Sequence, residues 1–322
     1  MPSPNDWGQD VWERLNNAVK AELARTRVAR KFLPVRSVPP DVTSVSSDSV
    51  VSPTPANPAL SIDEGSTTRL IEIWVEFSLT PAQVEGEGED TGKSVSSAAT
   101  TLATRAANLL AQAEDSVIFN GANAFTQSPL FNPPPTPSGV QPPPAVYHRG
   151  TPLDTGLLDL PPAGGTSSSQ SAVQTVIVPP LGSATPPIYG QNTFAAVAQA
   201  ISQLQANGNS GPYALVLNTV PYADLFAPLQ GTLIVPADRI RPLTTAGLYA
   251  SGTLPTANLP SSGIYSGLVV SLGGDTVDFV SALDGRVAFA EEDPEGNGRF
   301  RVIQRFALRL KVPTAVIRLI FQ

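Results

Sequence analysis

The segment LLAQAEDSVIFNG, Leu109–Gly121, closes a long alanine-rich stretch and carries two adjacent acidic residues, Glu114 and Asp115. Neighbouring side chains on a helix point about 100° apart, so these two carboxylates are poorly placed to flank one substrate as paired acid and base. We expect one of them to bond backbone or a basic side chain of a neighbouring segment, and the other to face solvent or a subunit contact. The pair is therefore predicted to be structural.

The same segment ends a helical pattern that starts near Ser94. Apolar residues recur at helical spacing, which predicts a long spine helix over 94–119. Upstream, RLIEIWVEFSLT (69–80) alternates strictly, with Ile71, Ile73, Val75, Phe77 and Leu79 on one face. That alternation predicts a strand with one buried face. The acidic stretch between strand and helix, 81–94, lacks the spacing of a calcium loop and is predicted to be a solvated turn.

Further elements follow from the same periodicities. Helices are expected at 10–29, at 192–208 and again from Pro221, with a buried strand at 213–218. The pairs Gly273-Gly274 and Asp284-Gly285 are predicted to be hairpin turns between the strands that close the chain. Between Pro129 and Gly190 lie 15 of the 33 prolines, so this segment is predicted to be a surface insertion on the outer face, with one edge strand inside SAVQTVIVPP.

Composition excludes several function classes. The 322 residues include no cysteine, which excludes disulfides and thiolate metal sites, and one histidine, His148, which an exposed loop explains better than catalysis. The net charge of −7 gives no chain-wide basic field for nucleic acid. The N-terminus lacks a signal-peptide pattern and no apolar run approaches about 20 residues, so we expect a cytoplasmic protein with no membrane partner. No phosphate loop, nucleophile elbow or metal cluster is recognisable, so neither catalysis nor a cofactor is expected.

Five segments, in order, carry a resemblance to encapsulins, the linocin or bacteriocin-type family of nanocompartment shell proteins with the HK97-like phage-capsid fold. WERLNNAV with ARKF is similar to the family's N-terminal helix and its Gly-Arg-Lys/Arg motif, with Ala29 in place of glycine. RLIEIWVEFSLT resembles the strand that ends the extended loop, and LLAQAEDSVIFNG the end of the spine helix. GPYALVLN and the closing strands, GGDTVDFVSALDGRVAF and FRVIQRFALRLKVPTAVIRL, complete the match.

The resemblance implies an α+β fold with six parts: an N-terminal helix and arm (1–40), an extended loop and strand (41–80) and the spine helix of a peripheral domain (81–128). A proline-rich surface insertion (129–190), an axial domain (191–270) and the closing strands of the peripheral domain (271–322) would follow.

It also implies a function, a self-assembling icosahedral shell of about 60 or more subunits that encloses a cargo enzyme. The cargo would be bound through its C-terminal targeting peptide, in a groove whose matching positions are Leu23, Arg30, Phe32 and Val35. The alternative for these positions is that they simply pack the helix on the body. The pore that admits small solutes would be lined by Pro228, Leu229, Gln230, Gly231 and Thr232.

Two other protein classes share part of this pattern. A phage or prophage major capsid protein has the same fold and packages DNA, and the basic run from Arg25 to Arg36 is compatible with that function. The acidity of the chain and the length of the resemblance favour the encapsulin. A secreted bacteriocin or protease is disfavoured, because we find neither an export signal nor a nucleophile with its base.

Overall fold

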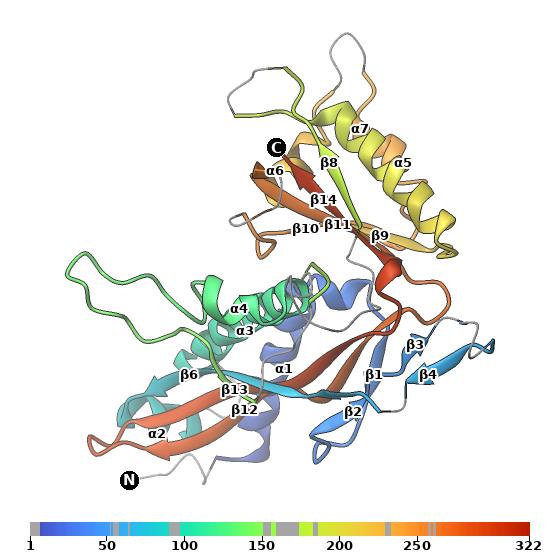
Figure 1. Ribbon diagram of the computed structural model, residues 1–322. Coiled ribbons are helices and arrows are strands. Elements are labelled where there is room, and N and C mark those ends of the chain that lie inside the picture. The colour runs from blue at the N-terminus through green and yellow to red at the C-terminus, as the bar shows by residue number, and fades with distance from the viewer. Residues whose placement is uncertain are drawn as a thin grey trace.

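The structure is a computed structural model that describes residues 7–51, 53, 58–63, 65–89, 97–150, 156–158, 174–182, 186–228, 233–256, 259 and 262–322. Over these residues the fold is α+β, with one five-stranded sheet in each of two units (Figure 1). The helices are α1 Gln9–Thr26, α2 Pro81–Glu89, α3 Ala98–Asn120, α4 Asn123–Gln127, α5 Gly190–Ala206, α6 Thr219–Asp224 and α7 Pro236–Ile240, with short 3-10 turns at Ala29–Lys31 and Pro313–Ala315. The strands are β1 Val35–Ser37, β2 Ser44–Ser46, β3 Ser49–Val51, β4 Ser61–Asp63, β5 Thr67–Arg69, β6 Ile71–Leu79, β7 Tyr147–Arg149, β8 Gln174–Val178, β9 Tyr213–Asn218, β10 Gly247–Ser251, β11 Tyr265–Ser271, β12 Val277–Glu292, β13 Gly298–Leu310 and β14 Val316–Phe321.

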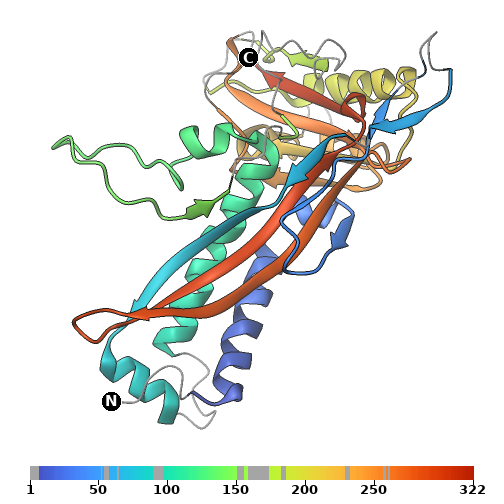
Figure 2. The same cartoon turned by 60° about the horizontal axis from the view of Figure 1, so that its bottom comes forward.

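The first sheet has the order β1-β12-β13-β6-β7 and forms the long body of the molecule. Figure 2 shows α3 and α1 running along one side of its long strands. The predicted alternation of β6 is confirmed, because Ile71, Ile73, Val75 and Leu79 are buried while the intervening side chains are more accessible. The apolar face of this strand therefore sets which side of the sheet receives the helices.

The spine helix α3 has clear signals at both ends. The Ser97 hydroxyl accepts a hydrogen bond from the Thr100 N–H at 3.1 Å, which satisfies one of the free donors at the start of the helix. Gly121, with φ of 56°, ends it. The buried side of α3 is rich in alanine, which lets α1 and the sheet approach closely; the buried alanines are Ala99, Ala103, Ala106, Ala107, Ala111 and Ala113.

Over 81–89 the acidic stretch before α3 is not a solvated turn, so the prediction was wrong there; residues 90–94 of that stretch lie outside the described residues. Residues Pro81–Glu89 form α2, in which Glu87 is only 3% exposed. Its carboxylate accepts from Arg14 at 2.7 Å and from the Ala99 N–H at 3.2 Å. Because Glu87 receives a cation from α1 and a backbone donor from the first turn of α3, it joins three helices, which periodicity alone does not reveal.

The second sheet has the order β10-β9-β11-β14-β8, and its central strands β9, β11 and β14 are buried on both faces. One face packs against α5 and α7 in a core of its own. Side chains from the other face, including Val216 and Val270, belong to the core of the first unit. This double burial explains why all six residues of β9 are buried. The predicted edge strand is confirmed, since β8 pairs only with β14 at the end of the sheet.

The closing strands differ from the expectation in two places. Asp284 and Gly285 do not form a hairpin turn; they lie within β12, at a register shift in its pairing with β13. Gly273-Gly274 is a turn, but it joins β11 of the second sheet to β12 of the first. After β12 and β13 the chain returns to the second sheet, where β14 pairs with β11. The C-terminal segment therefore belongs to both units.

The proline-rich segment is tied to both units. β7 pairs with β6 in the first sheet and β8 with β14 in the second. Between them the N–H groups of Leu157 and Leu158 donate to Ile118 and Phe119 at 2.9 and 2.8 Å, and both leucines are buried. A Cβ on Gly156 would lie 2.3 Å from the Gly121 nitrogen, so glycine is required there. Residues 151–155, 159–173 and 183–185 lie outside the described part of the insertion.

Candidate functional site

The acidic pair at the end of the spine helix binds the connection between α1 and β1. The Asp115 carboxylate accepts from the N–H groups of Val28 and Ala29 at 2.8 and 2.9 Å. Glu114 forms an ion pair with Arg27, whose Nε lies 2.9 Å from Oε2. The predicted structural role is confirmed, but both carboxylates are buried within the chain, so the expectation that one of them faces solvent or a subunit contact was wrong.

Burial dominates the electrostatics of this cluster. Removal from water raises the pKa of Asp115 to about 7, although the two backbone donors favour its charged form. Burial also raises the pKa of Glu114, against the attraction of Arg27. At Asp284 burial acts in the same direction, but the charges of Arg27 and Arg30 outweigh it and leave the pKa below its ordinary value. Arg27 therefore lies between two carboxylates, the buried one of Glu114 and the half-exposed one of Asp284.

The four residues predicted to bind a cargo peptide are close to this cluster but do not share one open surface. Leu23 is 1% exposed and lies against Gly285, where a Cβ would come within 2.2 Å of its Cδ1. Phe32 is 8% exposed and packs on Tyr249, with ring centroids 5.6 Å apart. Arg30 pairs with Asp284 at 2.8 Å and lies over the Phe279 ring, while Val35 is 44% exposed on β1. Only Arg30 and Val35 can therefore meet a ligand without a movement of the core.

Sequence reasoning missed Asp284 and Gly285 as part of this region, because the Asp-Gly pair is a typical turn signal. Gly285 provides the space that Leu23 fills, and Asp284 anchors both Arg27 and Arg30. The only sequence signal was an Asp-Gly pair inside an otherwise continuous strand pattern, which also fits a bulge.

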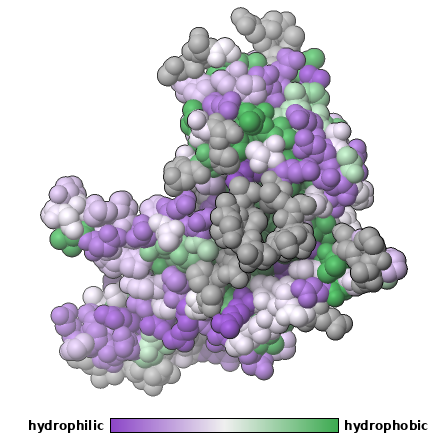
Figure 3. Space-filling view, in the orientation of Figure 1, coloured by the Kyte–Doolittle hydropathy of each residue, from purple (hydrophilic) through white to green (hydrophobic). Residues whose placement is uncertain are grey.

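Of the predicted pore residues, the structure describes only Pro228, which is exposed; Leu229, Gln230, Gly231 and Thr232 lie outside the described residues. The segment that follows is apolar and open, with Leu233 96% exposed and Ile234 54% exposed. Figure 3 shows hydrophobic surface gathered on the second unit, to which this segment belongs. These two aliphatic side chains are available for a contact with another chain.

The loop between β1 and β6 is a second exposed apolar segment. The β3–β4 hairpin carries Val50, Val51, Leu60 and Ile62, which are 39%, 40%, 70% and 56% exposed. Its base is held to the body by the Val50 N–H, which donates to the Lys311 carbonyl at 3.0 Å, and by the ion pair of Arg309 with Asp48. Arg309 is itself fixed by two contacts to buried Asp278. The loop is thus fastened at one end and apolar at the other.

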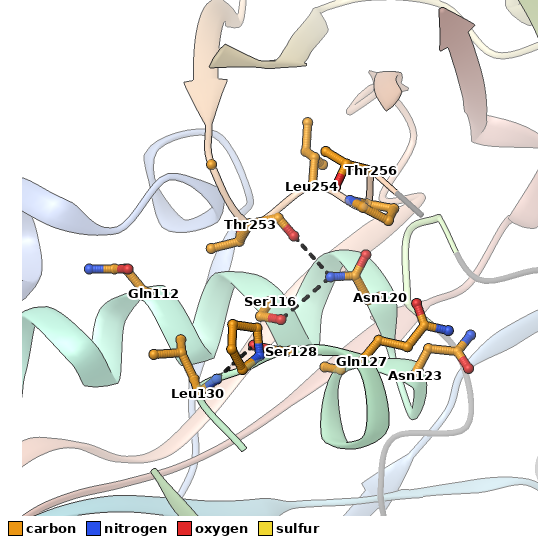
Figure 4. A pocket seen from close by; sticks show the side chains of 14 residues that line it. Gln112, Ser116, Asn120, Asn123, Gln127, Ser128, Leu130, Thr253, Leu254 and Thr256 are labelled. Carbon is orange, nitrogen blue, oxygen red and sulfur yellow. Dashed lines mark hydrogen bonds between the residues drawn. The ribbon is translucent and has the colours of Figure 1, made fainter. Parts of the chain in front are cut away.

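A pocket of about 290 Å³ lies where the end of α3 meets the β10–β11 connection (Figure 4). Asn120 donates to the Thr253 carbonyl at 3.0 Å, which links the two units across it. Carboxamides and hydroxyls provide most of the polar groups, including Gln112, Asn123 and Gln127, and none of the described residues around it carries a charge. The pocket therefore offers hydrogen bonds but no acid or base. The described residues likewise contain no group of three or more potential metal ligands, and no described helix is long and apolar enough to span a membrane.

Solved structures similar to this one include a virus-like particle and a phage capsid. A virus-like particle from Pyrococcus furiosus matches with a TM-score of 0.62 and 14% identity, over 96% of this chain and 98% of that one. The capsid of the myovirus XM1 matches with a TM-score of 0.54 and 12% identity, over 91% and 90%. At these identities the likeness shows the fold alone, that of the HK97-like capsid proteins, which confirms the predicted fold.

Sequence comparison then gives the family. The family model described as encapsulating protein for peroxidase matches residues 5–137 and 182–307, so the chain belongs to that family. EncA, a type 1 encapsulin shell protein of Myxococcus xanthus (strain DK1622), is 33% identical over 140 residues. That alignment spans 44% of this chain and 45% of EncA, less than half of each. The encapsulin resemblance noted from the sequence is confirmed.

Proposed function

We propose that the chain is the subunit of a closed icosahedral shell that encloses an enzyme, and that it has no catalytic activity of its own. The observation that carries this proposal is the exposed apolar β3–β4 hairpin in a member of this family. Its four apolar side chains are more than one third exposed, and burial of each against another copy would contribute on the order of 1 kcal/mol or more. Closed symmetry repeats such a contact on every subunit and leaves no free edge.

For the cargo we propose a redox enzyme, since the family description names a peroxidase as the enclosed protein. A C-terminal peptide of that enzyme would lie along β1, with Val35 as the apolar contact and Arg30 at its polar side. Leu23 and Phe32 would support this site from beneath. Leu23→Asp is a poor test of the site, because a carboxylate at a 1% exposed position would be buried without a partner.

Val35→Asp tests the cargo site without disturbing the core. We expect this variant to assemble normally and to lose the enzyme that co-purifies with wild-type particles from the native host. Val140→Asp is the matched control, because Val140 is also exposed, at 63%, but belongs to the proline-rich segment and not to β1. If Val35→Asp and Val140→Asp particles contained equal amounts of the enzyme, the peptide would bind at a site other than β1.

Electron microscopy of the chain expressed alone tests the shell. Uniform hollow particles would support it, and their diameter would give the number of subunits. A phage capsid protein is the alternative, because the fold is shared with XM1. Genome-length DNA inside the particles, or a chain that stays monomeric without a scaffold, would favour that alternative.

A further inference from the structure

Residues 132–146 form an arm, called the proline arm here, that stands away from the body between α4 and β7 (Figures 1 and 2). Seven of its 15 residues are proline. Both ends are fixed: Phe131 and Val146 are 8% and 1% exposed, and the Val146 N–H donates to the Leu130 carbonyl at 3.0 Å. The arm therefore leaves the core and re-enters it at defined points.

The arm is ordered by its own contacts. At its tip the Thr136 N–H donates to the Val140 carbonyl at 2.9 Å, and the Gly139 N–H donates to the Thr136 carbonyl at 2.8 Å. Gln141 Nε2 bonds the Pro133 carbonyl and so joins the outgoing and returning limbs. Proline fixes φ and keeps the preceding residue extended, so Pro133–Pro135 and 142–144 are held in polyproline II geometry.

The arm presents exposed proline rings and backbone carbonyls to a partner. Pro134, Pro135, Pro137 and Pro143 are exposed. Prolines have no N–H to donate, so the two runs present backbone carbonyls as acceptors beside apolar rings, with the Pro133 carbonyl already engaged by Gln141. Pro134 and Pro135 lie on the outgoing limb, Pro137 lies in the turn closed by the Gly139 N–H and the Thr136 carbonyl, and Pro143 lies on the returning limb. The arm contains no charged side chain, and the first charge beyond it is Arg149.

The family framework does not include most of this segment. The family match stops at 137 and resumes at 182, so the tip and the returning limb of the arm lie outside it. The outgoing limb, with Pro134 and Pro137, falls inside the family match, whereas the tip from Ser138 and the returning limb, with Pro143, fall outside it. The exposed surface of the tip and the returning limb is therefore not part of what the family model describes.

We propose that the proline arm is a docking ligand for a protein whose binding groove is lined by aromatic side chains. Such grooves receive pre-ordered polyproline II segments, stack on the rings and donate hydrogen bonds to the carbonyls. The ordering cost of binding is small because the arm is already fixed at both ends. If the proposed shell forms, many arms lie on one particle, and multivalent contact strengthens a weak single interaction by about 10²–10⁴-fold.

The first experiment measures binding of purified protein to immobilised SH3, WW and EVH1 domains, which serve as separate probes for an aromatic groove. We expect the wild type to bind at least one of them and Pro134→Ala/Pro137→Ala to bind at least tenfold more weakly. Pro186→Ala/Pro187→Ala, outside the arm, is the matched control and should bind as the wild type does. Wild-type protein that binds none of the probes, or equal binding by all three proteins, overturns the proposal.

The second experiment determines where the arm lies. The chain has no cysteine, so Ser138→Cys creates a single thiol at the tip. A polymer-linked maleimide too large to enter a shell should label intact particles as fully as denatured protein. Protection in intact particles would mean that the arm contacts a second copy or faces the interior, and would also overturn the proposal. A chain that binds the probes but stays monomeric would refute the shell and leave the arm as a ligand.

Discussion

Arg27→Met tests whether the buried ion pair between the residue that follows α1 and Glu114 of α3 holds the body together. The Arg27 side chain is 6% exposed and that of Glu114 is fully buried, with 2.9 Å between them. Methionine keeps much of the volume and removes the charge. In this variant Asp284 keeps its ion pair with Arg30 at 2.8 Å and is half exposed to water. The residue left with an uncompensated buried charge is therefore Glu114.

Removing one partner of a buried pair costs about 3–5 kcal/mol, because the other charge is left uncompensated. Glu114 escapes part of this cost by taking up a proton. Its pKa is already raised by burial, and loss of Arg27 removes the largest opposing influence. Since the folded state then binds a proton that the unfolded state releases, the defect should be largest at alkaline pH and shrink as pH falls.

The free energy of unfolding is measured by urea titration, with the fluorescence of the three tryptophans as the signal; Trp7 and Trp12 pack beside Phe300 and Trp74 lies on β6. Arg27→Met should be destabilised by about 3–5 kcal/mol at pH 8 and by less at pH 5. The double variant Arg27→Met/Glu114→Gln should recover part of the loss. A cost below about 1 kcal/mol, unchanged between the two pH values, would refute the reasoning.

Three further predictions concern other parts of the molecule. Burial raises the pKa of Asp115 from 3.8 to about 7, so between these pH values the folded state retains a proton that the unfolded state loses. As pH rises through that range, this carboxyl should lower the free energy of unfolding by up to about 4 kcal/mol. Asp115→Asn should therefore flatten the dependence of stability on pH measured by urea titration. Gly156→Ala should destabilise the protein by about 2 kcal/mol or more, because its Cβ would meet the backbone of Gly121, whereas Gly252→Ala, which has no atom within 4 Å of the new Cβ, should be near neutral in thermal unfolding. Deletion of 132–183 removes β8 and the anchoring Leu157 and Leu158 together with the proline arm, so it should impair assembly seen by electron microscopy, whereas a short glycine linker in place of 133–144 should leave particles intact.

The sequence alone determined the elements whose signals are local. Strict alternation identified β6, the recurring apolar residues identified α3 and α5, and the continuous apolar run identified β9, because each pattern follows from how many residues make one repeat of the backbone. The capsid-like fold was suggested by the resemblance of five sequence segments, in order, to the encapsulin family, and not by the periodicities themselves. The absence of cysteine and the single histidine could likewise be read directly.

Tertiary structure decided everything that depends on partners distant in sequence. Asp284-Gly285 reads as a turn, yet Leu23 fills the space at Gly285 and two arginines hold Asp284, so the strand continues through it. Glu87 reads as a solvated acid, yet it receives donors from α1 and α3. The same holds for Glu114 and Asp115, whose partners lie more than 80 residues away. A charged or turn-forming residue is buried only where another segment satisfies it, and that segment is known only once the chain has folded.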